Sequence, residues 1–254
     1  MQSFRHGSTA LSYIDESPEA ATGDPVLLIH GFASNHAVNW VNTLWVQTLK
    51  RAGRRVIALD NRGHGASSKL YEARDYHTSV MAEDARALLD HLGIARAHVM
   101  GYSMGARIAA FLALAHPGRL NTVVLGGLGL HLVDGIGLPQ SVADALEAPS
   151  LADVTDATGR MFRAFAEATK SDLKALAACI RGSRQVMTRA EAAGLAVPAL
   201  ICVGTRDLIA GDPHALARLI PGARAFDIAG RDHNLAVGDK TYKQAVINFM
   251  AEHS

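Results

Sequence analysis

Short apolar runs alternate along the chain with longer stretches of helical periodicity. Such runs are typical of strands that are buried on both faces of a parallel sheet. We expect these strands at residues 26–29, 55–60, 97–102, 122–125, 198–203 and 225–228, after an opening hairpin at residues 3–14. Helical periodicity predicts helices at residues 40–50, 80–92, 104–115, 213–220 and 240–252. The alternation implies βαβ crossovers and therefore an α/β fold with a mostly parallel central sheet flanked by helices.

Residues 128–195 interrupt this alternation. They contain helical stretches at 141–146, 158–169 and 173–180 and no pattern typical of a strand. Insertions of this kind commonly lie over the strand ends where ligands of α/β proteins bind. We therefore expect a core domain formed by residues 1–127 and 196–254, with a small helical lid at 128–195 inserted after the sixth strand.

The composition indicates a globular chain without a strong charge bias. Among 254 residues, 25 are basic and 24 are acidic, and 49% are hydrophobic. The near-zero balance gives no electrostatic footprint for nucleic acid, and the hydrophobic content argues against disorder. No apolar run approaches the length of a membrane span, and the first residues lack the apolar centre of a signal peptide. We expect a cytoplasmic protein with no membrane partner, in which Cys179 and Cys202 are reduced.

The candidate nucleophile lies in the segment Gly101-Tyr102-Ser103-Met104-Gly105. This Gly-x-Ser-x-Gly pattern follows an apolar strand and opens a helix, which is the context of a nucleophile elbow. A sharp strand-to-helix turn lifts the serine hydroxyl clear of the sheet, and the flanking glycines let neighbouring backbone pack closely. The turn also places Ser103 at a helix N-terminus, where developing negative charge is favoured.

A serine hydroxyl needs a general base, and that base needs an orienting carboxylate. Asp207 directly follows one apolar strand, and His233 follows the last strand, so both lie on the same rim of the sheet as Ser103. Asp232 is the rival carboxylate, but an adjacent residue is poorly placed to hold its neighbour's ring. The order Ser, Asp, His fits the nucleophile-elbow architecture.

With these motifs the chain resembles the α/β-hydrolase fold family, in its serine esterase and lipase-like branch, over nearly its whole length. His30-Gly31-Phe32, the segment from Asp60 to Ser67, the elbow, Asp207 and His233 stand in the order of that family's motifs. The resemblance implies Ser103 as nucleophile, His233 as base and Asp207 as orienting acid. It also implies an oxyanion hole formed by the backbone N–H groups of Phe32 and Met104.

These residues predict a hydrolase of carboxylic esters that works through an acyl-enzyme and takes a small-molecule ester as its partner. A lactonase or a C–C bond hydrolase with the same three residues remains an alternative, as does a ligand-binding protein without catalysis. Relatives with an aspartate nucleophile are disfavoured because position 103 is serine. No motif for a cofactor or a metal is present in the sequence. The candidate substrate-binding residues are Phe32, Leu128, Met161, Phe162 and Phe165.

Overall fold

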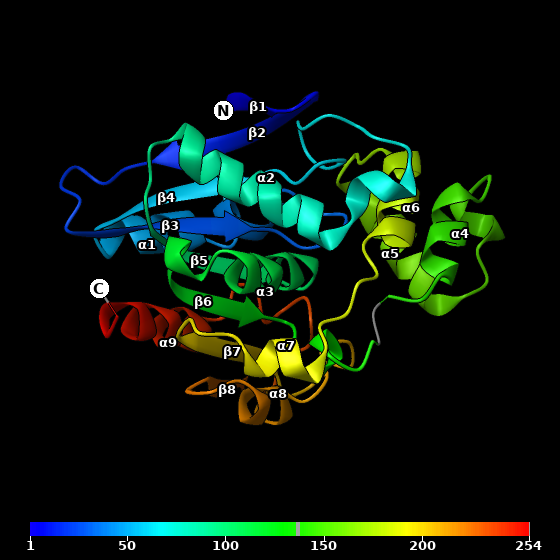
Figure 1. Cartoon of the computed structure of the whole chain (residues 1–254). Helices are drawn as coiled ribbons and strands as arrows, with labels where there is room; N and C mark the ends of the chain where they lie inside the picture. Colours follow the sequence, from blue (N-terminus) through cyan, green and yellow to red (C-terminus); the bar gives the residue numbers. More distant parts are fainter. Residues whose placement is uncertain (136–137, 254) are drawn as a thin grey trace.

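The computed structural model describes residues 1–135 and 138–253 and contains an eight-stranded sheet (Figure 1). The strand order is β1-β2-β4-β3-β5-β6-β7-β8. The two neighbour pairs that include β2 are antiparallel and the other pairs are parallel, so the sheet is mixed and mostly parallel. The strands are β1 (Gln2–His6), β2 (Thr9–Glu16), β3 (Gly23–Ile29), β4 (Arg54–Leu59), β5 (Ala97–Tyr102), β6 (Leu120–Gly126), β7 (Ala199–Gly204) and β8 (Arg224–Ile228).

Helices cover both faces of this sheet. The helices of the α/β layers are α1 (Trp45–Arg51), α2 (Thr78–His91), α3 (Met104–Ala115), α8 (Pro213–Leu219) and α9 (Lys240–Ala251). Buried residues of α2, α3 and α8 form one hydrophobic cluster with one face of the sheet, and those of α1 and α9 form a second cluster with the other face. Shorter helical turns are η1 (Ala37–Val41, a π-helix), η2 (Ala73–Tyr76) and η3 (Pro117–Arg119). Within the described ranges, no helix is long and apolar enough to cross a membrane.

The strand β3 shows why apolar runs predict this layering. Leu27 and Ile29 belong to the cluster under α2 and α3, whereas Val26 and Leu28 belong to the cluster under α1 and α9. Successive side chains of a strand point to opposite faces, so a strand covered on both sides is apolar throughout. The predicted strands are confirmed, and most end within two residues of the expected positions.

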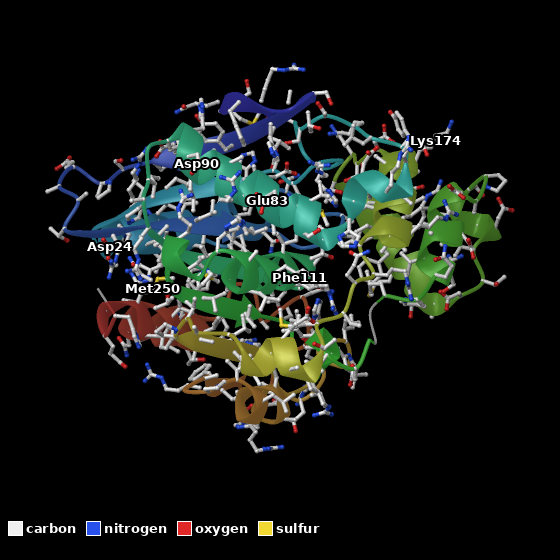
Figure 2. All side chains as sticks on the ribbon, in the orientation of Figure 1. Asp24, Glu83, Asp90, Phe111, Lys174 and Met250 are labelled. Carbon is white, nitrogen blue, oxygen red and sulfur yellow. The ribbon has the colours of Figure 1, made fainter. Side chains whose placement is uncertain are left out.

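The helix α2 shows the opposite pattern, with one apolar face and one charged face. Met81, Ala85 and Leu88 pack into the core. On the outer surface Arg86 forms ion pairs with Glu83 and Asp90, which lie three and four residues away. Figure 2 labels Glu83 and Asp90 on this helix. This division of the helix surface is what produces a period near 3.6 in the sequence.

The chain between β6 and β7 is helical in its described residues and contains no strand there. It comprises η4 (Leu130–Leu132), α4 (Ser141–Glu147), η5 (Leu151–Asp153), α5 (Ala157–Ala168), α6 (Leu173–Gly182) and α7 (Arg189–Ala193). In Figure 1, α4, α5 and α6 lie beyond the carboxyl end of β3, on the right of the view. Residues 136 and 137 of the predicted insertion, and residue 254 of the predicted core, lie outside the described residues. The division into core and lid domains stays a prediction.

Two helices differ from the expectation. The helix predicted at 40–50 is divided: Trp40 lies in η1, and α1 begins only at Trp45. Between them Leu44 has a φ of 66° and is 55% exposed, so the continuous helix predicted across this position is wrong. A tertiary contact accounts for this break, because the Trp45 indole Nε1 donates to the Val237 carbonyl at 2.6 Å and fixes the start of α1.

The second difference is α7, which the periodicity did not predict. It is only five residues long and begins with a capping box, in which Thr188 and Glu191 bond reciprocally to each other's backbone N–H groups. The Thr-x-x-Glu spacing is visible in the sequence and is the signal that could have located this helix. Cys179 on α6 and Cys202 on β7 are both buried and free, as expected.

Candidate active site

Ser103 lies in a strained turn between β5 and α3. Its φ and ψ are 54° and −114°, a backbone conformation that residues other than glycine rarely adopt. The flanking glycines are required by contact: a Cβ on Gly101 would lie 2.1 Å from the Gly105 carbonyl oxygen, and a Cβ on Gly105 would lie 2.0 Å from that of Ile29. Strain of this kind costs about 1–3 kcal/mol and persists only where the surrounding packing enforces it.

Ser103, His233 and Asp207 form one continuous hydrogen-bonded chain. His233 Nε2 lies 3.0 Å from Ser103 Oγ, and His233 Nδ1 lies 2.7 Å from Asp207 Oδ2. The Asp207 side chain is fully buried, and its Oδ1 accepts the backbone N–H groups of Ile209 and Ala210 at 2.8 and 3.1 Å. Three donors therefore hold this carboxylate in place, and it in turn orients the imidazole so that Nε2 faces the hydroxyl.

The rival carboxylate Asp232 faces its own turn. Its Oδ1 accepts the backbone N–H groups of Asn234 and Leu235 at 3.0 and 2.8 Å. The backbone of His233 is held instead by Tyr102, whose hydroxyl donates to the His233 carbonyl at 2.6 Å and whose ring lies 5.4 Å from the imidazole. The role of Tyr102 was not predicted, because nothing in the sequence near the elbow indicates a partner 131 residues away.

Two backbone donors lie beside the serine. In the described structure neither the N–H of Phe32 nor that of Met104 has a hydrogen-bond acceptor, and both residues line the same pocket as Ser103. Met104 is the first residue of α3, so its N–H is one of the donors that a helix start leaves without a partner. These N–H groups are available to an oxygen anion that forms next to Ser103.

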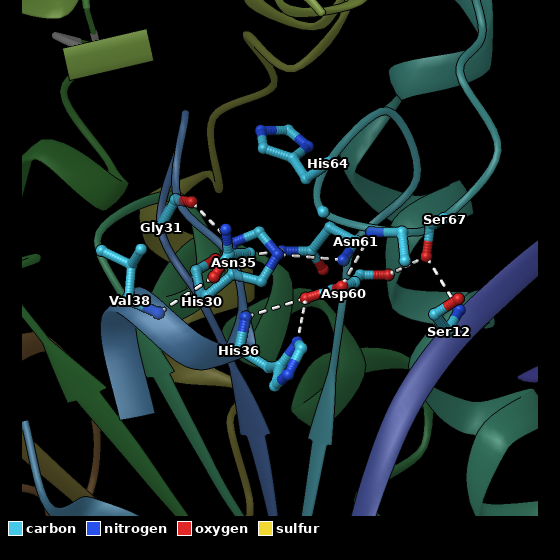
Figure 3. Close-up of polar contacts among 12 residues, drawn as sticks. Ser12, His30, Gly31, Asn35, His36, Val38, Asp60, Asn61, His64 and Ser67 are labelled. Atoms are coloured by element: carbon cyan, nitrogen blue, oxygen red, sulfur yellow. Dashed lines mark hydrogen bonds and ion pairs between the residues drawn. The ribbon is translucent and has the colours of Figure 1, made fainter. Parts of the chain in front are cut away.

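A buried polar network holds the loop that carries Phe32 (Figure 3). His30 Nδ1 donates to the Gly31 carbonyl at 2.7 Å, and His30 Nε2 accepts the Asn61 backbone N–H at 3.0 Å. Asp60 accepts the backbone N–H and Nδ1 of His36, both at 2.8 Å. Burial by itself raises the pKa of Asp60, but these hydrogen bonds outweigh it and lower the pKa to about 2. The segment from Asp60 to Ser67 therefore holds the loop of Phe32 through hydrogen bonds.

His64 belongs to the same region and braces its own turn. Its Nδ1 donates to the Arg62 carbonyl at 2.9 Å, and its ring packs edge-on against Phe32 at 5.9 Å. The side chain is fully buried, and burial lowers the pKa of His64 to about 3. A neutral imidazole is therefore part of the packing beneath Phe32.

Two pockets meet at Ser103, with Phe32 between them. The smaller, about 80 Å³, includes Met104, Leu128, Leu138 and Ile180 in its lining. The larger, about 390 Å³, is lined by His233 and by aromatic side chains of α5. Of the predicted substrate-binding residues, Phe32 lines both pockets, Leu128 lines the smaller one, and Met161, Phe162 and Phe165 line the larger one.

The arginine of the elbow helix is bound to backbone. Arg107 lines the smaller pocket, but its guanidinium donates to the carbonyls of His131, Leu132 and Gln185 at 2.6 to 3.2 Å. Burial lowers the pKa of Arg107 to about 10. This side chain therefore ties α3 to the helical segment above it, and it does not form an open anion site. Among residues 1–135 and 138–253, no cluster of three or more His, Cys, Asp or Glu side chains could hold a metal ion.

The comparison with protein families agrees with this architecture. Residues 24–173, more than half of the chain, match the family described as the alpha/beta hydrolase fold. The chain belongs to that family.

Individual relatives span several activities. The chain is 40% identical over 126 residues to the dihydrolipoyllysine-residue acetyltransferase component of an acetoin cleaving system from Pseudomonas putida, covering 48% of this chain and 32% of that one. It is 34% identical over 138 residues to epoxide hydrolase B from Mycobacterium tuberculosis, covering 52% and 36%. The chain thus spans about a third of the length of these curated relatives.

Solved structures match over nearly the whole chain. A hydrolase from Pseudomonas aeruginosa has a TM-score of 0.80 and 25% identity, covering 98% of this chain and 97% of that one. Structures at 21 to 23% identity, which share the fold, include an enol-lactonase, carboxylesterases and a meta-cleavage product hydrolase. The fold is thus shared by hydrolases that act on different bonds.

Proposed function

We propose that the protein is a serine hydrolase that cleaves carboxylic esters through an acyl-enzyme. The observation that carries this proposal is the chain of contacts from Asp207 through His233 to Ser103, at 2.7 and 3.0 Å, beside two unoccupied backbone donors. A base within hydrogen-bond distance of a hydroxyl, itself oriented by a buried carboxylate, is the arrangement that activates serine.

The reaction follows from this geometry. His233 Nε2 takes the Ser103 proton as Oγ attacks the ester carbonyl. The resulting oxyanion accepts hydrogen bonds from the N–H groups of Phe32 and Met104, each worth about 10²–10³ in rate. His233 then protonates the departing alcohol, and water, activated by the same imidazole, hydrolyses the acyl-enzyme. Throughout, Asp207 holds the tautomer of His233 and stabilises the imidazolium.

The two pockets differ in which half of the ester they accept. His233 must reach the leaving oxygen, and it lines the larger pocket but is not among the described residues that line the smaller one. The alcohol portion therefore lies in the larger pocket and the acyl portion in the smaller one. A volume of about 80 Å³ favours short acyl chains over long ones.

Lactones and C–C bonds next to a carbonyl remain the alternative substrates, because serine attack on a carbonyl begins all three reactions. Epoxide opening is not proposed, since position 103 carries serine in place of an aspartate nucleophile. A screen that includes aryl esters, lactones and vinylogous diketones separates these reactions. If a lactone or a diketone is hydrolysed with the highest kcat/KM, the protein is a lactonase or a C–C bond hydrolase, respectively.

The test of the mechanism is the variant Ser103→Ala. We expect it to lower kcat/KM for p-nitrophenyl acetate and butyrate by at least about 10³-fold, because the nucleophile is lost. A serine-reactive fluorophosphonate should label the wild type at Ser103 and leave the variant unlabelled, as read by peptide mass spectrometry. Circular dichroism shows whether the variant keeps its fold.

Two results would contradict the proposal. Wild-type rates in Ser103→Ala would show that Ser103 is not the nucleophile. Absence of both labelling and hydrolysis across the ester, lactone and diketone series would favour a ligand-binding protein that retains the fold without catalysis.

A further inference from the structure

Asn39 places an amide group inside the larger pocket, beside the nucleophile. It lies on the π-helix η1, is only 6% exposed, and lines this pocket. Its Oδ1 accepts the Gly31 backbone N–H at 2.9 Å. A Cβ built on Gly31 would lie 3.5 Å from Ser103 Cβ and 3.7 Å from Asn39 Oδ1, so the amide and the serine are near neighbours. Single π-turns occur frequently at functional sites.

The contact with Gly31 fixes which way the amide points. If the group were rotated, its NH₂ would face the Gly31 N–H and leave that donor without an acceptor, so Oδ1 must stay where it is. The Nδ2 group then has no acceptor among the described residues. Asn39 thus holds the loop of Phe32 with one atom and offers two N–H donors with the other.

Other polar groups of the larger pocket are already committed or exposed. The Thr43 hydroxyl donates to the Asn39 carbonyl and the Tyr102 hydroxyl donates to the His233 carbonyl. Asn234 is exposed to solvent. The exception is Ser34, which is 4% exposed and whose hydroxyl lacks a hydrogen-bond partner in the described structure.

The remaining lining is apolar, including Phe162, Phe165, Met161, Val38 and Val237. An unpaired polar group buried in such surroundings costs about 1–3 kcal/mol, which applies to the Ser34 hydroxyl. The Asn39 Nδ2 group is not fully buried and remains open to an acceptor that a ligand supplies. A pocket with apolar walls and few oriented polar groups is the usual form of a small-molecule site.

We propose that Asn39 is a specificity-determining residue whose Nδ2 donates a hydrogen bond to an oxygen on the leaving group of the substrate. This inference rests on the proposed ester hydrolysis, in which the alcohol occupies the larger pocket. The substrate class is then an ester of a short acid with an aromatic or apolar alcohol that carries an ether, carbonyl or hydroxyl oxygen. The hydroxyl of Ser34 lies at the same pocket and supports the same preference.

The experiment compares acetates whose alcohols differ only in that oxygen. The 2-, 3- and 4-methoxybenzyl acetates are matched in size by the 2-, 3- and 4-ethylbenzyl acetates. In at least one position we expect wild-type kcat/KM to favour the methoxy ester by about 2- to 10-fold, the range for one neutral hydrogen bond. In Asn39→Asp the Gly31 contact is kept but the donor becomes an acceptor, so that ratio should fall to 1 or below.

Asn42→Asp is the matched control. Asn42 ends the same π-helix, is exposed, and does not line the larger pocket in the described structure, so it adds the same charge without touching the substrate. We expect it to keep the wild-type ratio. Ser34→Ala should also lower the methoxy-to-ethyl ratio.

Binding of the product alcohols, measured by calorimetry on wild type and on Asn39→Asp, reads the same preference without turnover. An equal affinity for methoxy and ethyl alcohols in the wild type, or an unchanged preference in Asn39→Asp, would overturn the role of Asn39. A retained preference for the methoxy alcohols without hydrolysis of any ester would overturn the proposed reaction and leave the role of Asn39 in place.

Discussion

At the scale of single residues, the site depends on two glycines that flank the nucleophile. Ser103 can occupy its positive-φ turn only because Gly101 and Gly105 let the first turn of α3 approach the ends of β3 and β5. The obstructing atoms are backbone carbonyls, which cannot move aside as a flexible side chain could. The same close approach brings the start of α3, with the N–H of Met104, next to the loop of Phe32.

The variant Gly105→Ala tests this contact. Alanine is intrinsically better than glycine in a helix by about 1 kcal/mol, but a Cβ only 2.0 Å from the Ile29 oxygen forces backbone to shift. We expect the clash to win and the free energy of unfolding to fall by at least about 2 kcal/mol in urea titrations.

Gly118→Ala is the control for that measurement, because nothing lies within 4 Å of a Cβ at this position. It should change the free energy of unfolding by no more than about 0.5 kcal/mol. Equal effects of the two variants would show that the elbow relaxes easily and that its glycines are not required by packing.

At the scale of elements, α5 is connected to the loop that carries the Phe32 donor. Thr169 directly follows α5, and its hydroxyl lies 3.1 Å from the Ala33 carbonyl. Its one proton is shared between that oxygen and the carbonyls of Phe165 and Ala166 at 3.0 and 3.1 Å. The Phe162 ring lies 5.9 Å from that of Phe32. Ala33 has a φ of 56°, so this loop is itself strained. A helix from the segment between β6 and β7 therefore helps to hold a proposed oxyanion donor in position.

The variant Thr169→Val keeps the shape of the side chain and removes the hydroxyl. Because the lost contact holds the loop, we expect kcat for p-nitrophenyl acetate to fall by about 3- to 10-fold, equivalent to roughly one hydrogen bond. Thr158→Val, at the start of α5, has no such contact in the described structure and should retain wild-type kcat. If kcat is equal in both variants, α5 does not support the loop.

At the scale of the whole molecule, several histidines are buried in the neutral form. Burial lowers the pKa of His30, of His64 to about 3, and of His98, on β5, to about 4. In the unfolded chain an imidazole titrates near 6.5, so below that pH unfolding takes up protons that the folded protein does not bind. The stability from these groups is fully present above about pH 6.5 and is lost as the pH falls toward the folded-state pKa.

The variant His64→Asn tests this linkage. Its amide can donate to the Arg62 carbonyl as Nδ1 does, but it does not titrate. Each buried histidine lowers the free energy of unfolding by up to about 1.4 kcal/mol per pH unit, so the wild-type decline between pH 6.5 and 4 should become shallower by up to that amount. Urea titrations at several pH values give the slopes, with the exposed His214→Asn as control. An unchanged slope in His64→Asn would contradict the prediction.

Local sequence patterns predicted most of the elements and the candidate chemistry. The bounds of β5 and α3 match their prediction residue for residue, because hydrophobic period and the Gly-x-Ser-x-Gly turn are local properties. The positions of Asp207 and His233 after parallel strands likewise predicted that they lie on one rim, since parallel strands end at a common edge.

Other features depend on contacts between segments that are distant in the sequence. The strand order, the break at Leu44, the Tyr102 hydrogen bond to His233 and the separation of Leu128 from the phenylalanines of α5 into two pockets have no local signature. Each of these features is fixed by side chains that meet only after the chain has packed. Residues more than a hundred positions apart can select a partner only through shape and hydrogen bonding in the folded protein.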